Sequence, residues 1–419
     1  METLLVLIFV IGYLAIILEH NIHINKTASA LFTGTTIWAV YALTAENHEL
    51  IDHQLLEHLG DISSILFFLL GAMTIVELVD TYHGFDIITD RIKTDSKKKL
   101  LWLISIITFF LSAILDNLTT TIVMITLLRK LINDKEDRMT MAGMVVIAAN
   151  AGGAFSPIGD VTTTMLWIGG QISTTNIIEK VILPSVICMV IPLLILSFQT
   201  TGKLTITPSK PAADAPSFEK TLFLILGVGG LIFVPVFKTI THLPPYVGML
   251  FVLSILWATS EVLSKDKPKD QKKRYSVYHA LERLDIPTVL FFLGILLAVA
   301  GLQSFGTLTD AAMWLDTTFQ NQTTIVTLIG LLSAIVDNVP LVAASMGMYS
   351  LEQYPMDHSF WELLAYCAGT GGSALIIGSA AGVAVMGMEK ITFMWYLRKI
   401  SWLALIGYFA GIAAFLLLN

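Results

Sequence analysis

Long apolar runs separated by short polar intervals cover almost the whole chain. A membrane-spanning helix needs about 20 mostly apolar residues. The first run has no basic region and no small-residue cleavage site before the next polar loop, so we expect a retained helix there. The pattern predicts an all-α polytopic membrane protein. Ten segments approach the spanning length: 1–18, 27–43, 61–80, 139–168, 174–200, 219–239, 246–263, 286–303, 360–389 and 400–418.

Two further apolar stretches, 100–132 and 322–350, are too long for one helix and too short for two. Each carries an Asp-Asn pair at its middle, Asp116-Asn117 and Asp337-Asn338. Such a stretch is typical of a re-entrant hairpin, whose polar tip is tolerated at membrane depth where protein or water satisfies the backbone. The flanks of the first stretch are both basic, and those of the second are both acidic. The positive-inside rule therefore predicts that one hairpin enters from the cytoplasm and the other from outside.

The two halves of the chain are expected to be inverted copies of one another. The segment Leu111–Asn117 (LSAILDN) recurs as Leu332–Asn338 (LSAIVDN), with six of seven residues identical. Loop charges place both termini outside, and each half then holds five spans and one hairpin, an odd span count that forces opposite orientations. We therefore predict two inverted-topology repeats, each with five spans, a re-entrant hairpin and a broken helix. The expected division is 1–200 (hairpin 100–132, broken helix 139–168), a cytoplasmic linker 201–218, and 219–419 (hairpin 322–350, broken helix 360–389).

Composition agrees with a membrane protein. Hydrophobic residues make up 55% and charged residues 14% of the chain, and the mean hydropathy is +0.75. An ordinary soluble domain has about 25% charged residues. The formal charge of −7 is spread over the polar intervals and forms no basic face for nucleic acid. The lipid bilayer is the expected partner, and Cys188 and Cys367, inside apolar segments, do not suggest a disulfide framework.

The two aspartates at the hairpin tips are the first candidates for function. A carboxylate in mid-membrane is costly, so one retained there suggests a role in binding ions or protons. The alternative is that each Asp simply caps the helix that follows it, although asparagine would cap without the charge. Three threonines, Thr119 to Thr121, follow the first pair, whereas Val339-Pro340-Leu341 follow the second. We therefore expect the two tips to differ.

A second candidate is the glycine- and proline-rich run 150–164, which should break the helix that contains it. Unwound backbone and side-chain oxygens are the hard ligands that a small alkali cation prefers. The alternative is a kinked helix whose polar groups satisfy one another. The second half repeats the break at 369–382 without a carboxylate, so the main site should lie in the first half. The candidate ligands are Asn150, Ser156, Asp160, Thr162 and Thr163 in the first break, and Thr370, Ser373 and Ser379 in the second.

Charged residues elsewhere give weaker signals. Glu77 is either an acid that supports the site or a side chain that reaches the membrane interface. His48, His53 and His58 are expected as solvated residues of an external loop. No Lys or Arg falls deep in any span, which disfavours a carrier of dianions.

The two Asp-Asn tips, the run AFSPIGDVTTTMLW at 154–167 and the run GTGGSALIIGSAAGVAVMG at 369–387 resemble the D-type sodium/proton antiporters (NhaD) of the ion transporter superfamily. The resemblance implies scaffold helices that hold a mobile transport domain. It also implies a homodimer in a bacterial inner membrane with a role in pH homeostasis. The implied protein is a transporter of Na⁺ or Li⁺ and H⁺, not an enzyme, and needs no cofactor.

The expected mechanism is competition between cation and proton for shared carboxylates, namely Asp116, Asp337 and Asp160. The cation Na⁺ is expected at Asp116, Asn117 and Asp160. Rival interpretations are a sodium- or proton-coupled anion transporter for dicarboxylate or arsenite on the same fold, an intramembrane aspartyl protease, and a passive channel. Further expected cation ligands are Asn338, Asn150, Ser156, Thr162, Thr163, Thr120, Ser373 and Ser379, supported by Glu77 and Thr370.

Overall fold

The structure is a computed structural model that describes residues 2–44, 48–89, 94–203 and 216–418. These residues are mostly helical, with one isolated β-bridge between Ser96 and Lys203. The helices are α1 (Glu2–Ile17), α2 (Glu19–Ile22), α3 (Lys26–Thr44), α4 (His48–Thr81), α5 (Asp86–Thr89), α6 (Lys97–Leu115), α7 (Asn117–Leu131), α8 (Lys135–Ala154), α9 (Val161–Ile168), α10 (Thr174–Gln199), α11 (Ser217–Thr241), α12 (Pro245–Ser264), α13 (Lys269–Arg274), α14 (Val277–Glu282), α15 (Ile286–Phe305), α16 (Thr307–Phe319), α17 (Gln322–Leu332), α18 (Asn338–Met348), α19 (Ser359–Gly371), α20 (Ala380–Glu389), α21 (Phe393–Tyr396) and α22 (Trp402–Leu418), the last two joined by a π-helical turn (Leu397–Ser401).

Seven helical segments of the described chain are long and apolar enough to cross a membrane. Shorter apolar helices accompany them, among them α7, which follows the first Asp-Asn pair, and α17 and α18, which flank the second. The protein is therefore an integral membrane protein of the polytopic α class. The seven segments are His48–Thr81, Lys97–Leu115, Thr174–Gln199, Ser217–Thr241, Pro245–Ser264, Ile286–Phe305 and Phe393–Leu418.

The segment that contains His48, His53 and His58 is helical, whereas a loop was expected. A loop was expected before residue 61, but α4 begins at His48 and runs for 34 residues. Residues 48–59 contain no glycine or proline, and Leu, Glu and Gln among them are good helix formers. The helix therefore continues beyond its apolar part. Most of the expected linker 201–218, residues 204–215, lies outside the described chain.

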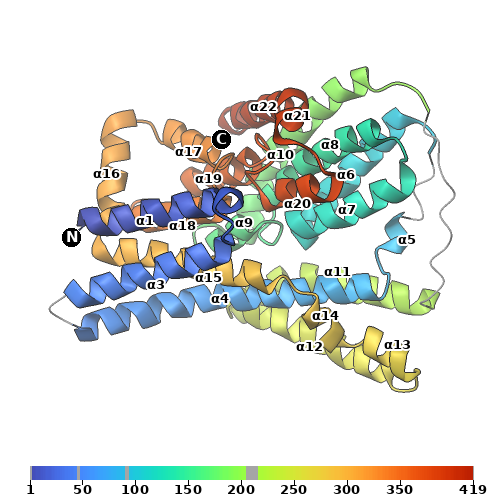
Figure 1. Cartoon of the computed structure of the whole chain (residues 1–419), viewed down its shortest axis with the longest axis horizontal. Helices are drawn as coiled ribbons and strands as arrows, with labels where there is room; N and C mark the ends of the chain where they lie inside the picture. The colour runs from blue at the N-terminus through green and yellow to red at the C-terminus, as the bar shows by residue number, and fades with distance from the viewer. Residues whose placement is uncertain (1, 45–47, 90–93, 204–215, 419) are drawn as a thin grey trace.

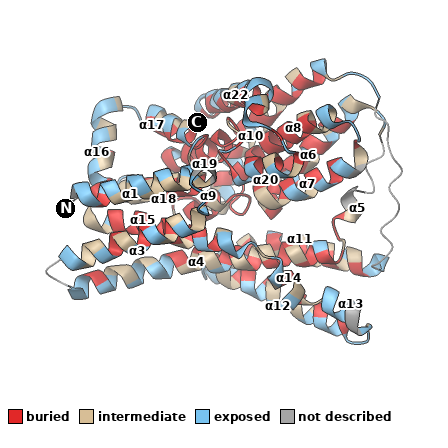
Figure 2. Ribbon diagram, viewed as in Figure 1, coloured by how far each residue is buried: buried red, intermediate tan, exposed pale blue. Residues whose placement is uncertain are grey.

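The helices form two sides of one body. In Figure 1, α3, α4, α11 and α12 lie along one side, and α6, α7, α8, α10 and α22 lie along the other. Figure 2 shows that buried residues are concentrated in the second side, above all in α8, whose residues 141–154 are all buried. A helix that is buried all round belongs to the centre of a protein. The polar break that follows α8 is thus held in the interior.

Glycines bring the helices next to the Asp-Asn pairs into backbone contact with the broken helices. A Cβ on Gly152 of α8 would lie 2.1 Å from the carbonyl oxygen of Phe109 on α6. A Cβ on Gly371 of α19 would lie 1.9 Å from the carbonyl oxygen of Gly330 on α17. Since real Cβ atoms do not come so close to backbone, both contacts require glycine. They fix each tip relative to a helix break.

Candidate functional site

The first Asp-Asn pair lies where α6 ends and α7 begins. Asp116 has φ 79° and ψ 160°, a backbone conformation that L-residues other than glycine rarely adopt. Its two carboxylate oxygens accept hydrogen bonds from the backbone nitrogen and the hydroxyl of Thr119, both at 2.8 Å. Asp116 thus caps α7, as the alternative interpretation expected. Capping leaves further lone pairs on both oxygens, so the observation is compatible with ion binding.

The second pair lies at the start of α18, after a short turn that follows α17. Asp337 accepts a hydrogen bond of 3.2 Å from the backbone nitrogen of Val339. The ammonium nitrogen of Lys26, the first residue of α3, lies 4.0 Å from Oδ2 of Asp337. Lys26 precedes a span in the sequence, and nothing in the local pattern indicated that the fold would bring it to this tip.

Asp160 is the centre of the site. It caps α9 and accepts hydrogen bonds from the backbone nitrogen (2.9 Å) and hydroxyl (2.6 Å) of Thr162. Nδ2 of Asn117 donates to its Oδ2 at 2.6 Å, and Nδ2 of Asn338 donates to both oxygens at 3.3 and 3.4 Å. Only 2% of Asp160 is exposed. The asparagines of both tips therefore meet at one buried carboxylate.

Asn150 extends this network to the second helix break. Its Oδ1 accepts from Nδ2 of Asn117 at 3.0 Å. Its Nδ2 donates to the hydroxyls of Ser373 and Ser379, both at 2.9 Å. All four side chains are buried. Amide, hydroxyl and carboxylate oxygens from α7, α8 and both breaks are thus gathered in one polar centre.

The charges of this centre are unbalanced. Asp116 and Asp337 each precede an asparagine that bonds Asp160, so three carboxylates are gathered around one buried centre. Like charges in a desolvated site are unfavourable unless a proton or a cation neutralises them. No three His, Cys, Asp or Glu side chains of the described chain could hold one metal ion together. A cation bound here would need neutral oxygens beside the carboxylates.

The remaining candidates of the sequence lie around the centre, with local partners of their own. The hydroxyl of Ser156 accepts from the backbone nitrogen of Ile158 at 3.4 Å. The hydroxyls of Thr163 and Thr370 donate to backbone carbonyls at 2.9 and 2.6 Å. The buried hydroxyl of Thr120 has no hydrogen-bond partner within the described residues.

Thr119, rather than Thr120, is the threonine that bonds the first aspartate. The pattern contained the signal for this, because a capping side chain bonds the backbone nitrogen two or three positions into the helix. Thr119 is the third residue of α7. The contact between Lys26 and Asp337 had no such signal, since it joins residues from opposite ends of the chain.

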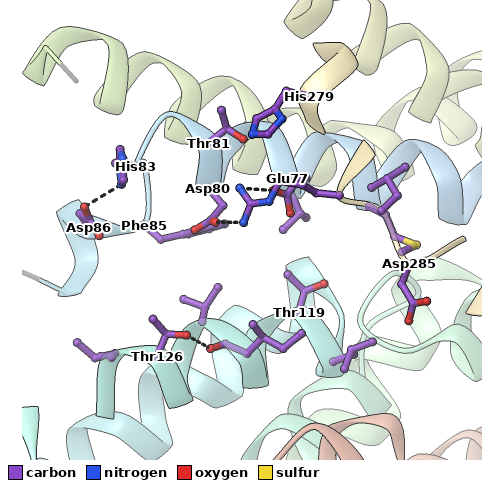
Figure 3. A pocket seen from close by; sticks show the side chains of 18 of the residues that line it. Glu77, Asp80, Thr81, His83, Phe85, Asp86, Thr119, Thr126, His279 and Asp285 are labelled. Carbon is purple, nitrogen blue, oxygen red and sulfur yellow. Dashed lines mark hydrogen bonds and ion pairs between the residues drawn. The ribbon is translucent and has the colours of Figure 1, made fainter. Parts of the chain in front are cut away.

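Two neighbouring cavities lie at the centre and beside it. The inner cavity, of about 80 Å³, is lined by Asp116, Asn117 and Asp160 among others. The outer cavity, of about 580 Å³, lies between α4, α7 and the segment 274–285. Met73, Leu118 and Thr119 line both. Figure 3 shows the outer cavity, with Thr119 and Thr126 on one wall and the acidic residues Glu77 and Asp80 on the other. We call it the vestibule.

Glu77 belongs to the wall of the vestibule and does not contact the network around Asp160. Its Oε1 lies 2.8 Å from Nη1 of Arg283, and Asp80 Oδ2 lies 3.9 Å from Nη2 of the same guanidinium. Arg283, which lines the vestibule together with Arg274, is therefore already paired with two carboxylates. This leaves the path to Asp116 with no excess of positive charge from Arg283.

Comparison with known proteins gives matches over most or all of this chain. The profile of the citrate transporter family (CitMHS) matches residues 13–361. The chain is 49% identical over 417 residues to Sodium/proton antiporter 1 of Arabidopsis thaliana, covering 99% of this chain and 72% of that protein. It is 47% identical over 414 residues to Sodium/proton antiporter 2 of the same plant, covering 98% of each. It is 32% identical over 450 residues to the Na⁺/H⁺ antiporter NhaD of Vibrio cholerae, covering 99% and 91%.

Proposed function

This chain belongs to the family of NhaD-type sodium/proton antiporters, and we propose that it exchanges Na⁺, or Li⁺, for H⁺ at Asp116, Asp160 and Asp337. The observation that carries the assignment is the meeting of both hairpin-tip asparagines at the buried Asp160. This arrangement concentrates negative charge and hard oxygen donors in one place. Those are the properties that bind either an alkali cation or a proton.

Exchange follows from competition for the same carboxylates. When a proton occupies the site, the repulsion between Asp116 and Asp160 is relieved and a cation gains little by binding. When the proton leaves, the two carboxylates and the oxygens of Asn117 and Asn150 favour the cation. A ligand shifts a conformational equilibrium only by its differential affinity for the two states. Tight coupling therefore requires that the empty, doubly charged site crosses the membrane slowly.

The cavities supply the path on one side. An ion that enters the vestibule passes Glu77 and Asp80, then Thr119, and reaches Asp116 and Asp160 in the inner cavity. The basic segment 264–285 lies at the vestibule, so the positive-inside rule makes this end cytoplasmic. In this proposal the conformation is inward-facing and both chain termini lie outside.

Alternating access is best served by the inverted repeats 1–200 and 219–419. In such transporters the substrate lies at the interface of the repeats, and one part of the protein rocks or slides against the other. The tips from both halves contribute an asparagine to Asp160, which supports this organisation. The hairpins and broken helices would be the moving part. A homodimer and a bacterial inner membrane stay predictions.

The two tips have unequal roles in this proposal. Asp116 lines the inner cavity and is held by Thr119, so it forms the cation site together with Asn117 and Asp160. Asp337 is paired with Lys26 and acts as the partner acid. The hydroxyls of Thr162, Ser373 and Ser379 orient Asp160 and Asn150.

Anion transport is the second candidate, because the matching family profile describes a citrate transporter. A dicarboxylate would meet Asp116 and Asp160 at the end of the path, and like charges disfavour its binding there. Lys26 is engaged by Asp337 and Arg283 by Glu77. Adding citrate in place of sodium to the assay below distinguishes the two functions.

The test is sodium-driven proton movement in proteoliposomes that contain a pH-sensitive dye. A sodium pulse should produce a fluorescence change with the intact protein and none with Asp116→Asn or Asp337→Asn. Asp310→Asn is the matched control, because Asp310 is exposed on α16, and it should keep the parent's rate. Full activity of both tip variants would overturn the assignment.

A further inference from the structure

The two tips have the same Asp-Asn pair but differ in the residue three positions after the aspartate. In the first tip that position is Thr119, whose backbone nitrogen and hydroxyl both bond Asp116. In the second tip it is Pro340, which has no N–H and no hydroxyl. In the described part of the chain, Asp337 accepts one hydrogen bond within its own tip, from Val339. The second tip therefore lacks the local donors that fix the first.

Lys26 is the positively charged partner of Asp337. Its ammonium nitrogen is 4.0 Å from Asp337 and 4.6 Å from the centre of the Phe291 ring on α15. A cation over an aromatic face is attracted by the ring. The lysine is thus held between one partner on α15 and one on the second tip.

Helices α3 and α15, which carry Lys26 and Phe291, are joined closely to each other. The hydroxyl of Thr27 donates to the carbonyl oxygen of Pro287 at 2.9 Å, which ties the start of α3 to the start of α15. A Cβ on Gly34 of α3 would lie 2.4 Å from the carbonyl oxygen of Gly294, so the two helices pack backbone to backbone. Lys26 is therefore presented to the tip by a fixed helix pair.

We propose that Lys26 is a positioning residue for transport, in which its ion pair with Asp337 substitutes for the threonine contact of the first tip. The pair fixes the Asp337–Asn338 tip, and through Asn338 it orients Asp160 in the inward-facing conformation. This inference rests on the proposed exchange function. On that mechanism the contact joins α3 and α15 to a hairpin that must move, so it forms in one conformation and breaks in the other.

The kinetic test uses the proteoliposome assay over a range of sodium concentrations. Lys26→Gln should raise the apparent KM for Na⁺ by about two- to five-fold, the effect expected from one partly exposed ion pair. Lys26→Arg keeps the charge and should restore the parent's KM. Pro340→Thr in the Lys26→Gln protein should also restore it, because it rebuilds in the second tip the donors that Thr119 provides in the first. A role of Lys26 in general stability would not respond to Pro340→Thr.

The matched control is Lys97→Gln. Lys97 pairs with Asp137 between α6 and α8, and the side chains of that pair are 24% and 22% exposed, compared with 34% and 22% for Lys26 and Asp337. Loss of a similar pair away from the tips should leave the KM unchanged. An unchanged KM in Lys26→Gln, or an equal rise in Lys97→Gln, would show that the lysine does not position the tip.

A second readout needs no transport activity and so separates this inference from the proposed function. Both native cysteines, Cys188 and Cys367, are buried, and Thr126→Cys places a single accessible thiol in the vestibule. Lys26→Gln should change the rate at which a membrane-impermeant maleimide labels this thiol. In an Asp337→Asn background, Lys26→Gln should cause no further change. An undiminished effect in that background would refute the pair, even if sodium-driven proton movement is absent in the parent.

Discussion

Truncating the two tip asparagines one at a time tests the geometry around Asp160. Nδ2 of Asn117 lies 2.6 Å from Oδ2 of Asp160 and 3.0 Å from Oδ1 of Asn150. Nδ2 of Asn338 lies 3.3 and 3.4 Å from the same carboxylate. Bonds beyond about 3.2 Å fall at the weak end of the N–H···O range. Asn117→Ala should therefore impair the site much more than Asn338→Ala.

The magnitude follows from the contacts that are lost. Asn117→Ala removes a short hydrogen bond to a carboxylate, which contributes about 1.5–3 kcal/mol, and leaves Oδ1 of Asn150 without its donor. A loss of about 2 kcal/mol corresponds to a rise in the apparent KM for Na⁺ of about 30-fold. The long contacts of Asn338 should contribute under about 1 kcal/mol, or a rise of up to about five-fold.

The measurement is sodium-driven dequenching in proteoliposomes at a fixed pH and a series of sodium concentrations. Asn321→Ala serves as the control, because Asn321 caps α17 at an exposed position. Equal effects of Asn117→Ala and Asn338→Ala, or a larger effect of Asn338→Ala, would refute the reasoning. Either result would mean that the difference between the Asn117 and Asn338 contacts to Asp160 has no bearing on cation binding.

Three further substitutions probe the surroundings of the site. Gly152→Ala should lower the free energy of unfolding by about 1–3 kcal/mol and impair exchange, because the added Cβ would lie 2.1 Å from a backbone oxygen. Gly387→Ala is the control and should be tolerated, because no atom lies near its added Cβ. Equal melting temperatures of the two variants in detergent would contradict this. Glu389→Gln should lower the melting temperature far more than Glu261→Gln, since only Glu389 is a buried carboxylate held by arginines of α7 and α8. Thr119→Val should raise the KM for Na⁺ while Thr119→Ser keeps it, and similar KM values for both would exclude a role of the hydroxyl that bonds Asp116.

Local pattern was sufficient to predict the elements that surround the site. Apolar length indicated the membrane class, and the Asp-Asn pairs and glycine-proline runs lie at helix ends in the structure. These features are readable because a polar or helix-breaking group inside an apolar run has few structural solutions. The start of α4 at His48 was missed because hydropathy reports where a helix is apolar and not where it begins.

Contacts between distant segments could not be predicted from the pattern. The choice of Asn117 and Asn338 as donors to Asp160 depends on how the starts of α7 and α18 pack against the break between α8 and α9. The pairing of Lys26 with Asp337 depends on the packing of α3 on α15. Neither arrangement leaves a signal in spacing or composition, because the residues are far apart in sequence.

The different partners of the two tips indicate where the boundary between the moving and the fixed part of the protein lies on the proposed mechanism. Asn117 and Asn338 both bond Asp160, so the two tips and the break between α8 and α9 share one network. Glu389, buried between arginines of α7 and α8, ties α20 to the same body. Lys26 is the charged contact to this body from α3, which packs tightly on α15. On the proposed mechanism the moving boundary therefore passes between Lys26 and Asp337, while the contacts around Asp160 travel intact with the bound ion.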